Sequence, residues 1–148
     1  MPKRRATWIV IADSSRAQIV TRREDQTGFD IVTALQSADA HASSHELGVD
    51  RPGRMQESAN PAHHVIEPRV DAHEESTLEF LRMVAQYLNE NATSTEVRSL
   101  VLFAPPRALG HLRKMLNAAV TRKISAAAPK DLTRVPFADL PKHLEALP

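Results

Sequence analysis

One proline-rich stretch, residues 37–70, gathers the side chains of this sequence that are best suited to bind phosphate. Its basic members are Arg51, Arg54, Arg69, His63 and His64. The planar guanidinium of arginine presents paired N–H donors that match two phosphate oxygens at once. Because Pro52 and Gly53 stand between Arg51 and Arg54, a tight turn there would present both guanidinium groups together. The stretch therefore predicts a basic patch for a phosphate backbone; the alternative is a solvated loop whose charges bind nothing.

The same residues show neither the alternation of a strand nor the 3.6-residue period of a helix. Three prolines interrupt them, and a loop of this length inside a compact domain is usually functional or disordered. The segment Asp71-Ala72-His73-Glu74 then matches a helical capping box with Asp71 as the N-cap. We therefore expect a loop over residues 37–70 and a helix from Asp71 to about Asn89.

Carboxylates at strand ends could form a second kind of site, because a two-metal nuclease needs several of them to converge. Asp13 follows an apolar run, and Glu74, Glu75 or Glu79 could approach from the first helix. The fourth predicted strand runs into Ala104-Pro105-Pro106, however, and supplies no carboxylate. The nuclease set is therefore incomplete, and we expect Asp13 to hold the turn after the first strand through bonds to backbone N–H groups.

Other catalytic and metal-binding patterns are incomplete or missing. His41 and His45 are four residues apart, but no third ligand has the spacing of a zinc site. There is no Gly-x-Ser-x-Gly motif, and the four glycines of the chain form neither a P-loop nor a dinucleotide-binding fingerprint. We therefore predict no metal site and no cofactor.

Basic residues also cluster around the second predicted helix. They are Arg107, Arg113, Lys114, Arg122 and Lys123. Such residues could extend a basic surface toward RNA, or they could form the ordinary solvated side of an amphipathic helix. The chain has one Trp and one Tyr, so stacking of bases on these side chains is not expected. Recognition of the RNA backbone and shape is the expected mode.

The apolar pattern predicts a strand meander followed by alternating helices and strands. The predicted strands are residues 6–12, 17–23, 29–35, 98–104 and 123–128. The second helix opens at Pro106, and the last helix opens at Pro136 with Leu140, Leu144 and Leu147 along one face. A meander followed by right-handed crossovers predicts an α/β fold, a mixed five-stranded sheet in ribonuclease-H-like order with helices packed on it.

The bulk composition predicts one domain over residues 1–148. The chain is 42% hydrophobic and 25% charged, and its length suffices to bury a core without disulfides. It has no cysteine and no apolar run long enough for a signal peptide or a membrane helix, so we expect a cytoplasmic protein with no membrane partner. The net charge of +1 implies that any nucleic-acid surface is a local patch. The oligomeric state stays open.

Four stretches in this order resemble a known family. They are Trp8 to Asp13 with Arg16 to Ile19, Asp50 to Arg54, Leu102 to Arg107 with Leu109-Gly110 and Leu112-Arg113, and Lys130 to Thr133 with Pro136 and His143-Leu144. Together they are similar to the bacterial host attachment protein family over nearly the whole chain. That family in turn resembles the middle domain of eukaryotic and archaeal class-one peptide-chain release factors, whose Gly-Gly-Gln loop enters the ribosome.

The resemblance implies a ribosome- or tRNA-binding role for the long loop. The position of the Gly-Gly-Gln loop matches Gly53-Arg54-Met55-Gln56, where the paired glycines are missing. This departure argues against peptidyl-tRNA hydrolysis and leaves RNA binding, with Arg51 and Arg54 on phosphates and Gln56 hydrogen-bonded to RNA. Two alternatives stay open: an indirect or structural role in attachment to host cells through a protein partner, and a metal-dependent hydrolase that uses Asp13 and a helix glutamate.

Overall fold

A meander of three strands begins the fold. The computed structural model describes residues 6–38 and 62–148, and for residues 62–71 it describes only the helical backbone. The strands are β1 (Ala6–Ala12), β2 (Arg16–Arg22) and β3 (Phe29–Gln36). β1 pairs with β2, and β2 pairs with β3, both in the antiparallel sense. The predicted meander is confirmed, and its boundaries lie within one residue of the prediction.

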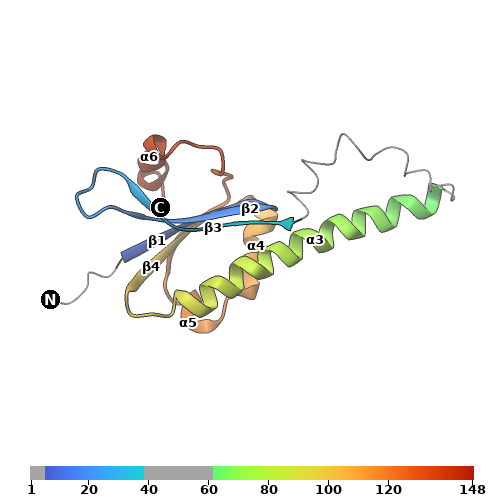
Figure 1. Cartoon of the computed structure of the whole chain (residues 1–148), viewed down its shortest axis with the longest axis horizontal. Coiled ribbons are helices and arrows are strands. Elements are labelled where there is room, and N and C mark those ends of the chain that lie inside the picture. The colour runs from blue at the N-terminus through green and yellow to red at the C-terminus, as the bar shows by residue number, and fades with distance from the viewer. Residues whose placement is uncertain (1–5, 39–61) are drawn as a thin grey trace.

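Two parallel strands complete the sheet. β4 (Val97–Phe103) runs parallel to β1, and β5 (Ile124–Ala128) runs parallel to β4. The described strands form a mixed five-stranded sheet in the order β3-β2-β1-β4-β5, with helices packed on it (Figure 1). The predicted α/β fold class is therefore confirmed. β1 and β4 are apolar along most of their length because both are central strands that are covered on both faces.

The long helix begins earlier than the sequence predicts. α3 spans Ala62–Asn91, so Asp71 lies inside the helix and does not cap it. The loop predicted over residues 37–70 was therefore too long at its C-terminal end. Pro68 misled the prediction, because proline lacks an N–H donor and is unfavourable inside a helix, yet α3 continues through it. None of the helices in the described part of the chain combines the length and the apolar character that a membrane span requires.

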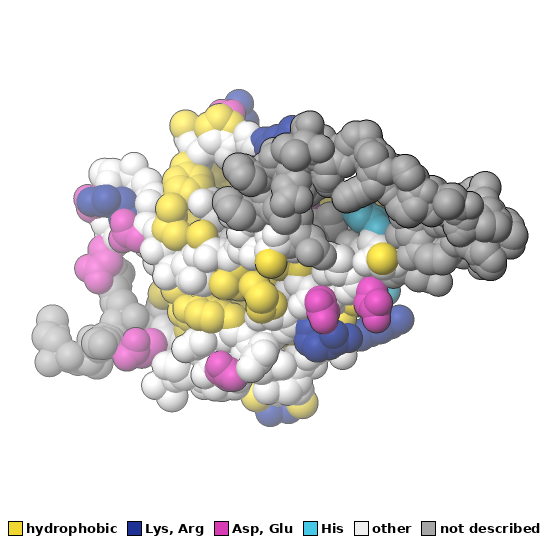
Figure 2. Space-filling view, turned by 45° about the vertical axis from the view of Figure 1, so that its right-hand side comes forward, with side chains coloured by type: hydrophobic (Ala, Val, Ile, Leu, Met, Phe, Trp, Pro, Cys, Tyr) yellow, Lys and Arg dark blue, Asp and Glu magenta, His cyan; other side chains and the backbone are white. Residues whose placement is uncertain are grey.

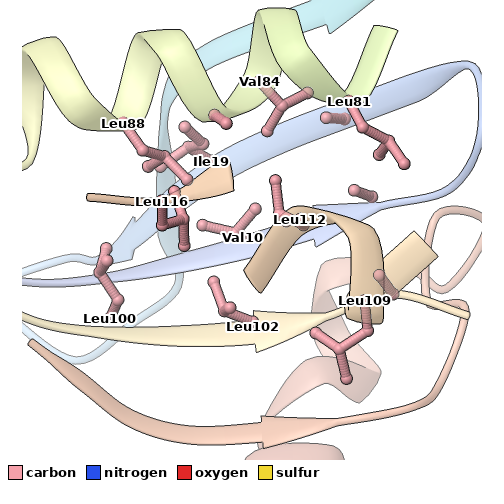
Figure 3. Close-up of a cluster of buried hydrophobic side chains, with 14 of the residues drawn as sticks. Val10, Ile19, Leu81, Val84, Leu88, Leu100, Leu102, Leu109, Leu112 and Leu116 are labelled. Atoms are coloured by element: carbon pink, nitrogen blue, oxygen red, sulfur yellow. The ribbon is translucent and has the colours of Figure 1, made fainter. Parts of the chain in front are cut away.

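α3 and α4 (Pro106–Met115) cover one face of the sheet (Figure 1). Leu81, Val84 and Leu88 of α3 pack toward Val10 of β1 in a buried cluster of aliphatic side chains, which Figure 3 shows. Burial of each such side chain contributes roughly 1.5–3 kcal/mol. This layer therefore supplies much of the free energy of folding, and it fixes α3 and α4 side by side on the sheet.

The second predicted helix is in fact two helices. α4 ends at Met115, and α5 (Ala118–Thr121) begins after Asn117. The Asn117 side chain caps α5 by accepting the Val120 N–H at 2.9 Å. Asn89 of α3 bridges the break, because its amide donates to the Met115 carbonyl at 3.2 Å and accepts the Asn117 N–H at 2.9 Å. A side chain of α3 thus satisfies backbone groups that the break leaves open.

The C-terminal segment covers the other face of the sheet. Pro136 precedes a 3-10 turn, η2 (Phe137–Asp139), which leads into α6 (Leu140–Glu145). Leu140 is buried in a second hydrophobic cluster, and Leu144 and Leu147 pack against it. Leu140 and Leu144 confirm the predicted apolar side of the last helix, whereas Leu147 follows its end. The α-helix is shorter than predicted because a 3-10 turn replaces its beginning and it ends at Glu145.

Lys123 joins the end of α3 to the start of β4 and β5. Its ammonium donates hydrogen bonds to the carbonyl oxygens of Ala92 at 2.7 Å and of Ser94 and Val97 at 2.8 Å. A cation is favourable there because the C-terminal end of a helix carries partial negative charge. Lys123 is therefore a structural residue, although the sequence places it among the basic residues that could face RNA.

Replacing Lys123 with methionine should destabilise the fold. The variant keeps an unbranched side chain of similar length but removes three charge-assisted hydrogen bonds, so we expect a loss of about 2–4 kcal/mol in the free energy of unfolding. Urea denaturation followed by circular dichroism measures this loss. The matched control is Lys142→Met, because Lys142 is exposed and its ion pair with Asp139 is long at 3.9 Å. Equal losses in the two variants would contradict the structural role of Lys123.

Candidate functional site

A pocket of about 490 Å³ opens at the edge of the sheet where β1 and β4 end. Because these two strands are parallel, their carboxyl ends meet there, and Asp13 after β1 and Pro105 after β4 both line the pocket. Asp131, which follows β5, lines it as well. All three parallel strands therefore contribute to the pocket, at the edge where open α/β sheets commonly bind their ligands.

The two long helices supply the walls of the pocket. The apolar part of the lining is Leu78, Pro105 and Ala108. The polar residues from the helices are His73, Glu74, Thr77, Arg107 and His111. The Arg107 guanidinium donates to the Glu74 carboxylate at 2.8 Å and so links α4 to α3 at the rim. Figure 2 shows histidine side chains beside acidic and basic ones on the right-hand part of the face that it presents.

Asp13 is held by the turn that follows β1. Its Oδ1 atom accepts the backbone N–H groups of Ser15 and Arg16, both at 2.8 Å. Its Oδ2 atom lies 3.2 Å from the Thr133 hydroxyl, which also lies 2.5 Å from Asp131 Oδ1. The hydroxyl has one proton and donates to one carboxylate at a time. Thr133 therefore connects the two carboxylates that follow β1 and β5.

The pocket combines an apolar lining with carboxylate, imidazole, hydroxyl and guanidinium groups. Within residues 6–38 and 62–148, no group of three or more His, Cys, Asp or Glu side chains is placed to hold a metal ion. Of the three helix glutamates that the sequence offers to a hydrolase, Glu74 lines the same pocket as Asp13, whereas Glu75 and Glu79 are not part of its lining. Asp13 is engaged by backbone N–H groups, however, and Glu74 by Arg107. The remaining groups are hydrogen-bond donors and acceptors beside an apolar lining, which is typical of small-ligand pockets.

A stretch of sequence without acidic residues forms a basic surface beside the pocket. Residues 97–130 contain seven Lys or Arg and no Asp or Glu. Four of the seven are exposed on α4 and at the end of α5, and we call them the basic face: Arg107, Arg113, Lys114 and Arg122. Arg107 and Lys114 are two helical turns apart and therefore project from the same side of α4. Arg107 belongs to the pocket and to the basic face, so the two are continuous.

The charge of the basic face is largely uncompensated. Within the part of the chain that the structure describes, no carboxylate forms an ion pair with Arg113, Lys114 or Arg122. Arg107 is the exception, through Glu74. The clustering of basic residues in the sequence points to this surface, but the missing acidic residues over residues 97–130 are the stronger signal.

Comparison with known protein families gives one match. A family model described as "Protein required for attachment to host cells" matches residues 8–144. The chain belongs to this family. The resemblance read from its sequence motifs is thereby confirmed.

No curated protein matches this member of the host attachment family. Among solved structures, the crystal structure of the archaeal translation termination factor aRF1 is similar, with 12% sequence identity and a TM-score of 0.48. The match covers 95% of the host attachment chain and 39% of the archaeal chain. The chain therefore spans well under half the length of that factor.

The side chains predicted to bind phosphate lie outside the part of the chain whose side chains the structure describes. Arg51, Arg54 and Gln56 lie outside the described residues. His63, His64 and Arg69 belong to the first part of α3, where the description covers the backbone alone. Their contact with RNA stays a prediction, and the pocket and the basic face are the sites that the structure itself provides.

Substitutions of Asp13 should separate a role in the turn from a role of its charge. Asp13→Ala removes the acceptor of two backbone N–H groups, so we expect a loss of about 1–3 kcal/mol in the free energy of unfolding. Asp13→Asn keeps a side-chain oxygen at that place and should recover most of the loss. Chemical denaturation of both variants measures the difference. A loss for Asn as large as that for Ala would show that the negative charge itself is needed.

Proposed function

We propose that this host attachment family protein is a non-enzymatic RNA-binding module that docks on the phosphate backbone of ribosomal RNA or of a tRNA-like RNA. The observation that carries the proposal is the acid-free stretch of residues 97–130, whose exposed basic side chains form the basic face on α4 and α5. Arginine and lysine on such a face neutralise phosphates and release counterions, which supplies most of the free energy of non-specific RNA binding.

The local charge supports this proposal better than the charge of the whole chain does. The net charge of the protein is +1, whereas residues 97–130 carry seven positive charges and no negative one. At physiological salt, exposed charges interact over about 8 Å. A phosphate that approaches Arg113, Lys114 and Arg122 therefore meets three positive charges that no described carboxylate pairs with, and it is screened from acidic residues farther away.

The aromatic side chains favour recognition of the backbone over stacking of bases on Trp or Tyr. Trp8 and Tyr87 stack on each other, with ring centroids 6.3 Å apart and planes inclined by 25°. Both are partly buried and pack against the main core cluster. The one Trp and the one Tyr of the chain are thus engaged in the fold, which leaves phosphate contacts as the main source of affinity.

Removal of the basic face should weaken RNA binding and its dependence on salt together. For Arg113→Ala/Lys114→Ala/Arg122→Ala we expect the slope of log affinity against log salt to become shallower by about two, since each lost single-strand phosphate contact accounts for about 0.7. Fluorescence anisotropy with a labelled single-stranded RNA, repeated over a series of salt concentrations, measures the slope.

The matched control for this triple variant is Arg16→Ala/Arg134→Ala/Lys142→Ala. These three side chains are also exposed, and they lie outside the basic face, so the control loses the same net charge elsewhere. The proposal expects the control to bind nearly as well as the unmodified protein. Equal weakening in the two triple variants would mean that net charge, and not the basic face, determines binding.

The long loop is the second part of the proposal. Arg51, Arg54 and Gln56 are proposed to reach RNA from residues 37–70, as the sequence indicates. The double variant Arg51→Ala/Arg54→Ala in the same anisotropy assay should bind more weakly, with a slope shallower by about 1.4. An unchanged affinity would remove the loop from the proposal and leave the basic face as the binding surface.

The family description supports a second candidate function. Its members are described as required for attachment to host cells, and we expect this protein to contribute indirectly, from the cytoplasm, through a protein partner. Fractionation of cells that produce the protein tests the location. Recovery of the protein in an outer-membrane or extracellular fraction would contradict an indirect role and favour direct contact with the host.

A further inference from the structure

The pocket and the basic face meet at Arg107. This side chain starts the exposed line of basic residues on α4 and also lines the pocket, where it pairs with Glu74. A nucleic-acid strand whose phosphates lie along α4 therefore passes the mouth of the pocket. One part of a nucleotide bound there, its base or its phosphate, can therefore enter the pocket.

The charges of the side chains that line the pocket determine whether a phosphate or a base is the better ligand for it. Asp13, Asp131 and Glu74 all line it, and Arg107 offsets one of these three carboxylates. The remaining negative charge disfavours a phosphate inside the pocket. A neutral base meets no such repulsion, so a bound nucleotide places its base in the pocket and leaves its phosphates on the basic face outside.

The lining of the pocket suits a flat heteroaromatic ring. His73 from α3 and His111 from α4 line it from the two helices, and Leu78 and Ala108 add apolar surface. Imidazole rings are among the side chains on which unpaired RNA bases stack. The two histidines can therefore stack on a base, although Trp8 and Tyr87 are engaged in the fold. The volume of about 490 Å³ lies within the usual range of small-ligand pockets, roughly 300–1,000 Å³.

The carboxylates add a chemical preference among bases. Asp131 lines the pocket, and its Oδ1 atom accepts from the Thr133 N–H at 3.0 Å and from the Thr133 hydroxyl. Within residues 6–38 and 62–148, the turn engages Oδ1 and leaves the second oxygen of Asp131 without a hydrogen bond from the protein. A carboxylate oxygen accepts hydrogen bonds from exocyclic amino groups, as in the pairing of Asp or Glu with cytosine N4, and it repels the carbonyl oxygen that uracil has at the same position.

We infer that the pocket between α3, α4 and the ends of the parallel strands binds a single unpaired RNA base that carries an exocyclic amino group. The inference rests on the proposed function, because it uses the basic face to hold the flanking phosphates. His73 and His111 contact the faces of the base, and Asp131 accepts from its amino group.

Oligocytidylate and oligouridylate of equal length provide the test. They carry the same phosphates and differ at position 4 of each base, where cytosine has an amino group and uracil a carbonyl oxygen. The full chain should bind oligocytidylate about tenfold more tightly, the effect of one hydrogen bond to a charged acceptor. Fluorescence anisotropy at one fixed salt concentration measures both affinities.

Two variants separate the pocket from the basic face. Asp131→Asn keeps an acceptor for Thr133 but also offers an amide donor to uracil O4, so the preference for oligocytidylate should fall to near unity. His111→Ala should weaken both oligonucleotides while the dependence on salt stays unchanged. The triple variant of the basic face should lower both affinities and the salt slope but keep the preference.

The outcomes distinguish the two proposals. Two results would overturn the inference that the pocket binds a base: equal, salt-dependent affinity for the two oligonucleotides, or a preference that Asp131→Asn does not alter. Either result leaves the proposed function in place. If neither oligonucleotide binds, the proposed function fails, and the pocket is tested alone by titration with CMP and UMP while the NMR signals of His73 and His111 are followed. Shifts with CMP that UMP does not produce support the base pocket; no shift with either overturns it.

Discussion

The junction between the end of α3, β4 and β5 depends on one charged contact, the partly buried ammonium of Lys123 at the C-terminal end of α3. Its three carbonyl partners come from the end of that helix, the following turn and the first residue of β4, and Lys123 itself directly precedes β5. Four backbone segments therefore meet at a single side chain. Loss of this contact removes three hydrogen bonds that join the end of α3 to the beginning of β4 and β5.

The functional surfaces follow from this constraint. Near the end of α3, Asn89 satisfies both sides of the break between α4 and α5, and Arg122 is exposed directly after α5. At the other end of the same pair of helices, Glu74 and Arg107 meet over the ends of β1 and β4. The packing of α3 against α4 thus creates the pocket at one end and supports the basic face along its length.

The strands were predictable because each contains a short run rich in apolar or β-branched residues between residues that favour turns, and in β1 this run is almost unbroken. The first strand, the meander and the parallel strands follow from that pattern, and so does the placement of Asp13 at the edge of the sheet. Glu74 was also a candidate for that edge, because it lies near the beginning of the predicted helix. The start of α3 was not predictable in this way, because proline is unfavourable inside a helix and Pro68 therefore indicates a boundary, whereas α3 continues through it.

The contacts that define the site could not be derived from local pattern. Lys123 reaches carbonyls that lie 26 to 31 residues away, and Arg107 pairs with a glutamate 33 residues away. The break after Met115 depends on Asn89, which lies 26 residues earlier. The sequence alone gives no sign of which basic residues near α4 are structural and which are exposed. Only tertiary packing separates Lys123, which is structural, from Arg113, Lys114 and Arg122, which face solvent.

The most direct test of a phosphate-binding surface is co-sedimentation of the full chain with purified ribosomes over a series of salt concentrations. The basic face predicts that the protein pellets with ribosomes at low salt and is released steeply as salt increases, with about 0.7 to 0.9 log units of affinity lost per log unit of salt for each phosphate contact. Absence of the protein from the pellet at low salt, or binding that does not change with salt, would contradict the account.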